Sequence, residues 1–307
     1  MSERAASEHT VIVQISDVHV AESGNPHRSV DSLGALAHIL DAVEKTGDPP
    51  DLLLFTGDLA DRGEPAAYLR FRATVEPFAE RMAVPALYLP GNHDARPAFR
   101  AQLLGWEENE DVIDQVIWVG GLRVIALDST VPGAAHGELD DSQLDWLEGE
   151  LVTPAPLGTL VALHHPPIPG PSPFLNDIIL RQPERLAEAM AGRDVRMVLA
   201  GHTHHASAGV LGGVPVWVAT ASAYQIDVLA GAAEVLRGIP GSAFTRIDIT
   251  RSSAVATHIA VPASDEVVYE VGFETIRRYM RGEVSSDELR EALDGAPAEA
   301  DDALVAT

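Results

Sequence analysis

Five short clusters in this sequence combine Asp, Asn and His, the side chains that bind metal ions and transfer protons. In chain order they read DVH at 17–19, GDLAD at 57–61, GNHD at 91–94, HHPP at 164–167 and GHTHH at 201–205. They contain seven of the twelve histidines, so chance is a poor explanation for the grouping. Divalent transition metals accept carboxylate oxygens and imidazole nitrogens, and Asn adds a neutral amide oxygen. The clusters therefore predict a metal site.

Turn formation is the alternative explanation for any one cluster. Gly reaches positive φ, and Asn and Asp side chains bond to nearby backbone, so GNHD alone is an ordinary turn sequence. Five clusters with the same chemistry favour a shared site over five unrelated turns. The chain has no cysteine, which excludes disulfides and thiolate ligands and leaves oxygen and imidazole donors.

The number of candidate ligands predicts two ions rather than one. The candidates are Asp17, His19, Asp58, Asn92, His164, His202 and His204. Seven ligands exceed the needs of one ion, and a carboxylate can bridge two ions, which lie roughly 3.5 to 4 Å apart in such centres. Two divalent ions against the carboxylates of Asp17 and Asp58 leave a positive site. Such a site stabilises a bridging hydroxide and binds a phosphate oxygen, as displacement at phosphorus requires.

Three neighbours of these ligands have predicted roles of their own. His93 adjoins a ligand without being one, and is placed to protonate a leaving oxygen. Asp61 and Asp94 are expected to fix the orientation and tautomer of imidazoles, although Asp is also common as a helix cap or turn former. For His165 two interpretations stay open, a wall of the pocket or packing against the prolines that follow.

Apolar segments before the clusters are expected to position them. Short runs rich in Val, Ile and Leu predict strands buried on both faces at 11–15, 51–55, 86–89, 159–163 and 195–199. Helical patterns cover 30–43, 65–82 and 140–151. Repeated strand, helix, strand units imply a mostly parallel sheet that binds ligands beyond the carboxyl ends of its strands. In an extended segment, residues separated by one position, such as Asp17 and His19, would point to the same side.

Later segments predict a second sheet and a tail. Runs at 112–119 and 122–127 flank a Gly-Gly pair and indicate a hairpin. Strands at 214–219, 243–249 and 255–261 are expected to extend a second sheet against the first. We assign a catalytic domain to 1–261 and an acidic, partly helical extension to 262–307, in which 291–307 is expected to be disordered.

Composition narrows the class of protein and its partners. The chain has 307 residues and a formal net charge of −25, which repels nucleic acid and anionic membranes. No apolar run is long enough for a membrane helix, and the first residues lack the layout of a signal peptide. The expectation is a cytoplasmic protein that acts on a small molecule.

The five clusters, in this order, resemble the signature of the calcineurin-like metallophosphoesterases over roughly residues 10–260. The resemblance implies an α/β fold, a two-sheet α/β sandwich with flanking helices. It also implies that Asp17, His19, Asp58 and His204 hold one ion. The other ion would be held by Asp58, Asn92, His164 and His202.

A finer resemblance concerns HHPPIP and the segment from Leu127 to Leu151, which are similar to bacterial class III cyclic nucleotide phosphodiesterases. It implies hydrolysis of small phosphodiesters, most of all 3′,5′-cyclic AMP, with iron, manganese or zinc, and a possible homodimer. The related alternatives are a glycerophosphodiesterase and a broad-specificity phosphatase. A scaffold that binds partners without catalysis would be expected to have lost ligands, and none is missing.

Overall fold

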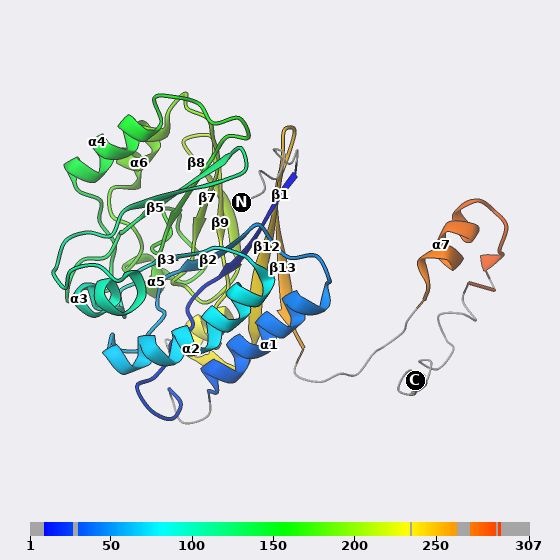
Figure 1. Cartoon of the computed structure of the whole chain (residues 1–307), viewed down its shortest axis with the longest axis horizontal. Coiled ribbons are helices and arrows are strands. Elements are labelled where there is room, and N and C mark those ends of the chain that lie inside the picture. The colour runs from blue at the N-terminus through cyan, green and yellow to red at the C-terminus, as the bar shows by residue number, and fades with distance from the viewer. Residues whose placement is uncertain (1–8, 27–29, 234, 263–270, 287, 290–307) are drawn as a thin grey trace. The chain divides into compact units, whose positions relative to one another are not determined.

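Two β-sheets pack face to face, and helices cover their outer faces (Figure 1). The computed structural model describes residues 9–26, 30–233, 235–262, 271–286 and 288–289. Contacts divide the chain into two units, 1–261 and 262–307, and both sheets belong to the first. In the second unit the described residues include the helix α7 (Phe273–Met280). The predicted disorder of 291–307 lies outside the described residues.

The first sheet has five strands in the order β13-β12-β1-β2-β3. Its parallel strands are β1 (His9–Ile15), β2 (Leu52–Thr56) and β3 (Ala86–Leu89). Two antiparallel strands complete it, β12 (Ser242–Thr250) beside β1 and β13 (Ala254–Val261) at the edge. The parallel strands therefore end at the same edge of this sheet, where their loops carry the first three clusters.

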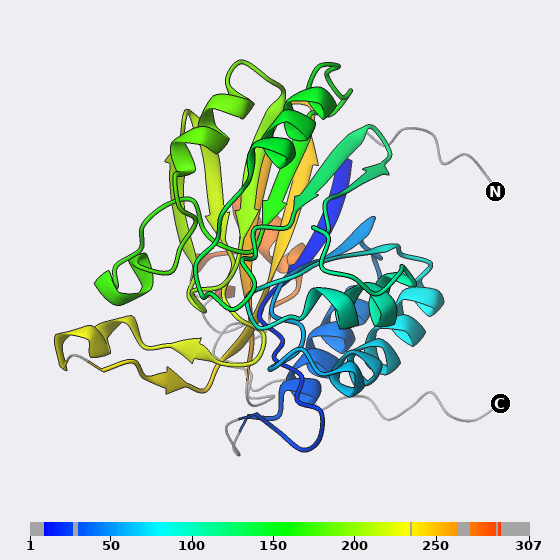
Figure 2. The same ribbon diagram turned by 90° about the vertical axis from the view of Figure 1, so that its left-hand side faces the viewer.

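The second sheet has six strands in the order β4-β5-β6-β7-β9-β8. Its strands are β4 (Gln115–Val119), β5 (Leu122–Leu127), β6 (Thr159–Leu163), β7 (Val195–Ala200), β8 (Ser207–Leu211) and β9 (Val214–Val218). Strands β5, β6, β7 and β9 are parallel to one another. A separate hairpin of β10 (Gln225–Ile226) and β11 (Gly238–Ile239), with the 3₁₀ helix η2 (Val228–Ala233) between them, projects from the sheets as the yellow arm of Figure 2.

The α/β class with two sheets is confirmed, but the predicted sheet membership is partly wrong. Strands β12 and β13 extend the first sheet, not the second, and β6 and β7 belong to the second. Both sheets are mixed rather than mostly parallel. An apolar run reveals burial but not its partner, and β12 finds β1 across a register from His9↔Thr250 to Gln14↔Thr245. The hairpin of β4 and β5 is confirmed, with a first strand shorter than predicted.

The three predicted helices are confirmed as α1 (Ser32–Lys45), α2 (Pro65–Met82) and α4 (Asp141–Glu150), with ends within two residues of the prediction, whereas α6 (Pro183–Met190) was not predicted. The first sheet is covered by α1 and α2, the second by α4 and α6 (Figure 1). Shorter helices in the loops are α3 (Arg96–Phe99), η1 (Arg100–Leu104) and α5 (Pro173–Asn176). At α4, Asp140 and Gln143 form a reciprocal capping box, which fixes where the helix begins.

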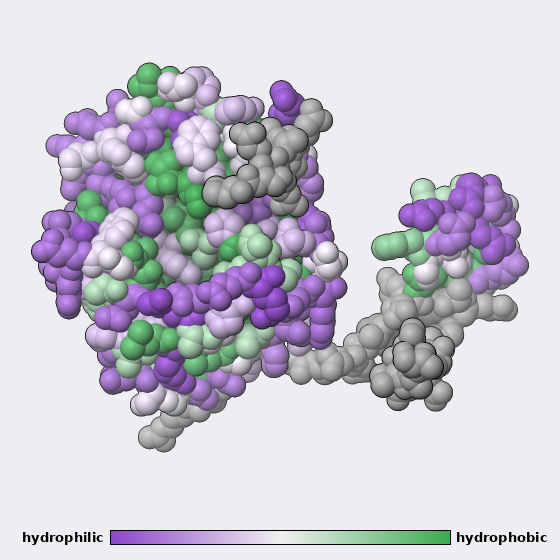
Figure 3. All heavy atoms as spheres, viewed as in Figure 1, coloured by the Kyte–Doolittle hydropathy of each residue, from purple (hydrophilic) through white to green (hydrophobic). Residues whose placement is uncertain are grey.

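Apolar side chains fill three layers of the first unit. Ile12 and Leu54 of the first sheet meet Val124 and Leu160 of the second in the middle layer. The outer layers lie beneath α1 and α2 on one side and beneath α4 and α6 on the other. The face of this unit seen in Figure 3 is mostly hydrophilic. Among the described residues, no helix is long and apolar enough to cross a membrane.

Asp114, just before β4, gives the fold a pH-dependent element. Its Oδ1 accepts hydrogen bonds from the Asp128 backbone N–H and from Gln143 Nε2, at 2.8 and 2.9 Å. Burial raises the pKa of Asp114 from 3.8 to about 6. A carboxyl whose pKa is raised in the folded state stabilises the fold fully below its unfolded pKa, and that contribution is lost as pH rises through 6.

We therefore expect Asp114→Asn to gain stability relative to the parent as pH rises from 5 to 8, by roughly 1.4 kcal/mol, because about one pH unit of that interval lies below the raised pKa. Urea unfolding at several pH values measures this change. Asp145→Asn, at an exposed position of α4, is the control and should follow the parent. A parent and an Asp114→Asn variant with parallel pH profiles would contradict the prediction.

Candidate metal centre

The loops that follow β1, β2, β3, β6 and β7 meet at one edge shared by both sheets. Within the first sheet, the backbone N–H of His19 donates to the Asp58 carbonyl at 2.8 Å. Between the sheets, the backbone N–H of His202 donates to both carboxylate oxygens of Asp17, at 3.0 and 3.1 Å. All seven candidate ligands lie in these loops, as the sequence predicts.

The first group of donors contains Asp17, His19, Asp58 and His204, whose ligand atoms lie within 4.8 Å of one another. The Nε2 atoms of His19 and His204 face each other at 3.0 Å. Asp17 Oδ1 lies 3.5 Å from His204 Nε2, and Asp58 Oδ2 lies 3.6 Å from His19 Nε2. All four side chains are buried. These are the residues that the resemblance assigns to one ion.

The second group surrounds the ring of His164. Its Nε2 lies 3.2 Å from Asn92 Oδ1, 3.2 Å from His202 Nδ1 and 3.4 Å from Asp58 Oδ2. Asp58 Oδ2 thus borders both groups, the position that a bridging carboxylate would occupy. His165 also lies here, since its ring nitrogen is within 4.8 Å of ring nitrogens of His164 and His202.

Left-handed backbone points the ligands into the site. Among the described residues, seven other than glycine have positive φ, and five of them are Asp17, His19, Asp58, His202 and His204. The predicted extended segment from Asp17 to His19 is therefore wrong, because both residues have φ near +50°. Such conformations are costly for L residues and persist only where surrounding structure enforces them.

Glycines let the loops approach closely enough to form the site. A Cβ on Gly57 would lie 2.3 Å from His164 Nδ1, and one on Gly91 would lie 2.3 Å from Asp58 Oδ1. A Cβ on Gly201 would overlap the Ser16 hydroxyl. In each of these three clusters the glycine is therefore needed to avoid a steric clash, in addition to any role that it has in a turn.

The charges of the site favour a cation. Burial would raise the pKa of Asp58, but the neighbouring His164 holds it well below its usual range. Burial would lower the pKa of His164, but Asp58 raises it to about 9. An ionised Asp58 thus requires a positive partner, and a divalent ion can replace the His164 proton in that role.

Two of the other candidate imidazoles, His202 and His204, favour the neutral form that binds a metal. At His19, by contrast, burial would lower the pKa, but Asp61 and the buried carboxylates raise it. Burial, aided by His164, lowers the pKa of His202 to about 3. Burial, aided by His19, holds the pKa of His204 well below its usual range. Metal binding needs deprotonated imidazole, so the donor set fits divalent ions.

Second hydrogen bonds orient the imidazoles. His164 Nδ1 donates to the Thr56 carbonyl at 2.8 Å, and His204 Nδ1 donates to the Tyr224 carbonyl at 2.9 Å. Each Nε2 lone pair then points into the site, an arrangement typical of metal-binding histidines. The roles of Thr56 and Tyr224 could not be predicted from the sequence, because every residue type has a backbone carbonyl.

His93 lies at the exposed side of the site, with its ring edge-on to His19 at 4.8 Å. Its Nδ1 donates to the Asp61 carbonyl at 2.7 Å, which leaves Nε2 available to a substrate. Its backbone N–H donates to Asp58 Oδ1 at 2.8 Å. Asp61 also places Oδ1 3.4 Å from His19 Nδ1. The predicted support from Asp61 thus has a geometric basis at two histidines.

Asp94 differs from its predicted role as an imidazole partner. Its carboxylate accepts hydrogen bonds from the backbone N–H groups of Leu59, Ala60 and Gly91 and from the Tyr68 hydroxyl, at 2.9 to 3.1 Å. It joins the loop after β2 to the loop after β3, the turn-forming role weighed as its alternative. Burial, aided by Asp58, raises the pKa of Asp94 to about 6.

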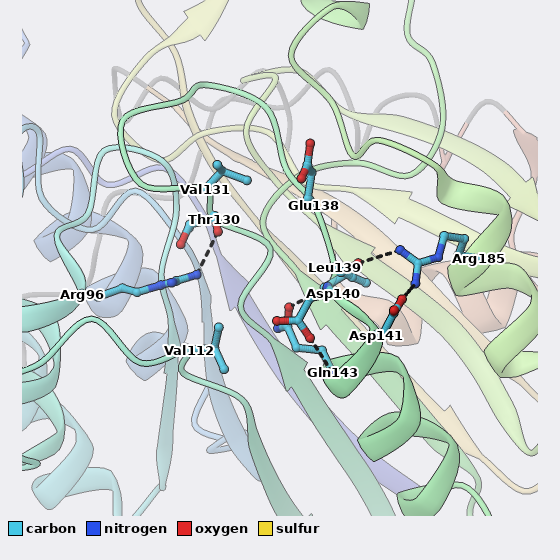
Figure 4. Close-up of a pocket in the computed structure, with 10 residues that line it drawn as sticks. All are labelled: Arg96, Val112, Thr130, Val131, Glu138, Leu139, Asp140, Asp141, Gln143 and Arg185. Carbon is cyan, nitrogen blue, oxygen red and sulfur yellow. Dashed lines mark hydrogen bonds and ion pairs between the residues drawn. The ribbon is translucent and has the colours of Figure 1, made fainter.

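A cavity of about 370 Å³ near Thr130 is lined by none of the candidate ligands (Figure 4). Its two cationic side chains are already paired. Arg96 donates to the Thr130 carbonyl, and Arg185 donates to the Leu139 carbonyl and to Asp141. We therefore place the chemistry at the strand-end loops and not in this cavity.

The close packing of Gly57 yields a test of the site. Gly57→Ala should displace His164 and weaken Mn²⁺ binding by at least about 10-fold, as measured by titration against a competing chelator. Gly47→Ala is the matched control, because Gly47 has a similar left-handed φ of +69° but open space around a new Cβ. Equal metal affinity in the two variants would contradict this account of Gly57.

Three comparisons with known proteins bear on the site. The family model for calcineurin-like phosphoesterases matches residues 10–206. A probable cyclic nucleotide phosphodiesterase of Rhodococcus erythropolis is 43% identical, over 71% of this chain and 72% of the relative. The cAMP/cGMP dual specificity phosphodiesterase of Mycobacterium tuberculosis is 42% identical, over 74% and 73%.

Among solved structures, a dimetal phosphatase from Danio rerio shares the fold, with a TM-score of 0.57 at 14% identity. The alignment covers 80% of this chain and 98% of that one. The family match spans all five loops, from Asp17 to His204, and everything between them. The chain belongs to the calcineurin-like phosphoesterase family.

Proposed function

We propose that this protein, a metal-dependent phosphodiesterase, hydrolyses 3′,5′-cyclic nucleotides, cyclic AMP above all, at a centre of two metal ions. The observation that carries the proposal is the convergence of all seven donors, with Asp58 between the two groups. The choice of cyclic nucleotides is supported by the names of the Rhodococcus erythropolis and Mycobacterium tuberculosis relatives described above.

The proposed reaction divides the work between the ions and the chain. When bound, the ions supply an activated water and positive charge for the phosphate oxygens. In this step His93 acts as the imidazolium: its Nδ1–H is held by the Asp61 carbonyl, its Nε2–H passes to the leaving oxygen, and the ring becomes neutral. Asp58 couples the two parts, since it borders both donor groups and accepts the His93 backbone N–H.

The donor set indicates the kind of metal. Imidazole nitrogens mixed with carboxylate and amide oxygens suit iron, manganese and zinc, and we propose ions of this class. Calcium and magnesium prefer oxygen ligands alone. A scaffold without metal would not require buried, neutral imidazoles directed at two carboxylates.

The net charge of the chain and the local charge of the metal site together favour a small substrate. A net charge of −25 repels a polyanion such as nucleic acid, while the local cation site still attracts a single phosphodiester. Cytoplasmic location and a homodimer stay predictions.

Substrate choice can be tested with the protein loaded with Mn²⁺. We expect turnover of cyclic AMP to exceed that of glycerophosphocholine and of p-nitrophenyl phosphate, with bis(p-nitrophenyl) phosphate as a generic diester. Faster hydrolysis of glycerophosphocholine would favour the glycerophosphodiesterase alternative. Activity on the monoester alone would overturn the phosphodiesterase assignment.

The role of His93 makes a separate prediction. His93→Ala should keep both ions and lower kcat by about 10²- to 10⁴-fold, the usual contribution of general acid catalysis. Metal content and kcat are measured on the same samples. His38→Ala, on the exposed surface of α1, is the control and should match the parent. Loss of metal from His93→Ala would show that His93 is a ligand rather than the acid.

A further inference from the structure

His202 differs from the other candidate histidine ligands in its outer nitrogen. His164 and His204 donate their outer N–H to backbone carbonyls. The outer nitrogen of His19 forms no hydrogen bond within the described part of the chain, but it lies 3.4 Å from the Asp61 carboxylate. His202 faces the site with Nδ1, 3.2 Å from His164 Nε2. Its Nε2 is buried, and no hydrogen-bond partner for it occurs within the described part of the chain. A ligand imidazole in this state would bury an unsatisfied N–H.

His165 has a ring nitrogen that could serve as the missing hydrogen-bond partner of His202. Its side chain is fully buried, and its Nε2 likewise has no hydrogen-bond partner among the described residues. The rings of His165 and His202 are in contact, with centroids 4.7 Å apart and planes at 55°. A ring nitrogen of His165 lies within 4.8 Å of a ring nitrogen of His202, so a shift of the His202 ring could bring the two into hydrogen-bond distance.

Ser129 and Gly137 fix the ring of His165 from the other side. Ser129 Oγ lies 2.8 Å from His165 Nδ1 and accepts the His165 backbone N–H at 3.3 Å. A Cβ on Gly137 would lie 2.5 Å from His165 Cγ, so the glycine backbone packs directly on the ring. Bridges from Gly137 to Thr130 and Leu180 hold that backbone in place.

One combination of tautomers allows a hydrogen bond between the outer nitrogens of the two rings. If His165 Nδ1–H donates to Ser129 Oγ, then His165 Nε2 presents a lone pair. A metal on His202 Nδ1 leaves the proton on His202 Nε2. The two outer nitrogens then form a donor and an acceptor, whereas the opposite tautomer of His165 would set two N–H groups against each other.

We propose that His165, held by Ser129, is a positioning residue that accepts the Nε2–H of His202 and so orients this ligand toward its metal ion. The inference rests on the proposed metal centre, but it does not depend on which phosphodiester is the substrate. It decides between the two interpretations of His165 that the sequence leaves open. The His165 ring then does more than pack against the prolines that follow it, because its Nε2 accepts a hydrogen bond from a neighbouring metal ligand.

Two substitutions at this position separate positioning from packing. His165→Phe keeps most of the ring volume and removes both nitrogens, so Mn²⁺ affinity at one of the two sites should fall about 10- to 100-fold. The Tm of the metal-free variant should equal or exceed that of the parent, because a buried unsatisfied nitrogen is removed. His165→Gln restores an acceptor oxygen and should recover most of the lost affinity.

Mn²⁺ affinity and stoichiometry are measured by titration against a chelator, without reference to hydrolysis. His205→Phe is the matched control, since His205 adjoins the ligand His204 and has a buried Nε2 without a partner among the described residues. The His205 Nδ1 bonds to the Thr203 carbonyl, and the Mn²⁺ affinity of His205→Phe should equal that of the parent.

Three results would overturn the proposal. Parent affinity at both sites in His165→Phe would show that packing suffices. Equal losses in the Phe and Gln variants would remove the acceptor role. A stoichiometry of one ion in His165→Phe, even at saturating Mn²⁺, would make His165 a direct ligand. Failure of cyclic nucleotide hydrolysis in the parent, with two ions bound, would instead refute only the proposed substrate.

Discussion

The buried contact between Asp58 and His164 is the interaction on which the site depends. Asp58 comes from the first sheet and His164 from the second, and both are almost inaccessible to water. Removing one charge from such a pair leaves the other buried and unpaired, which costs several kcal/mol. The middle apolar layer fixes the separation of the sheets, and therefore the distance across this contact. Packing far from the loops thus controls the geometry available to an ion.

Much of this arrangement could be predicted from the sequence. Apolar runs followed by Asp, Asn and His identified the strands and the loops, because both strand burial and ligand chemistry depend on residue type. The convergence of Asp17, Asn92 and His202 followed from the rule that ligands bind at the carboxyl ends of strands. That rule held although the strands are divided between two sheets, since the two carboxyl edges lie together.

The remainder depends on features that residue type does not encode. Pairing of β12 with β1 is a choice among several equally apolar partners. Positive φ at Asp17 and His19 depends on the neighbouring loops, because it is uncommon even for Asp and His, which adopt it more often than most residues. Thr56 and Tyr224 contribute backbone carbonyls, which a residue of any type could supply. Asp94 had both an imidazole-orienting and a turn-forming interpretation, and only the positions of three backbone N–H groups distinguish them.

The candidate ligands lie far apart in the sequence, and this separation affects when the protein can acquire its metal ions. His19 and His204 are 185 positions apart, and β1 gains its partner β12 only when the chain extends to Thr250. Contacts between such distant segments form slowly, and a preformed ion site rarely exists in an unfolded chain. The ribosome must therefore finish most of the protein before an ion can be captured. Metal loading is then a late step, set by the ions available to the newly folded protein.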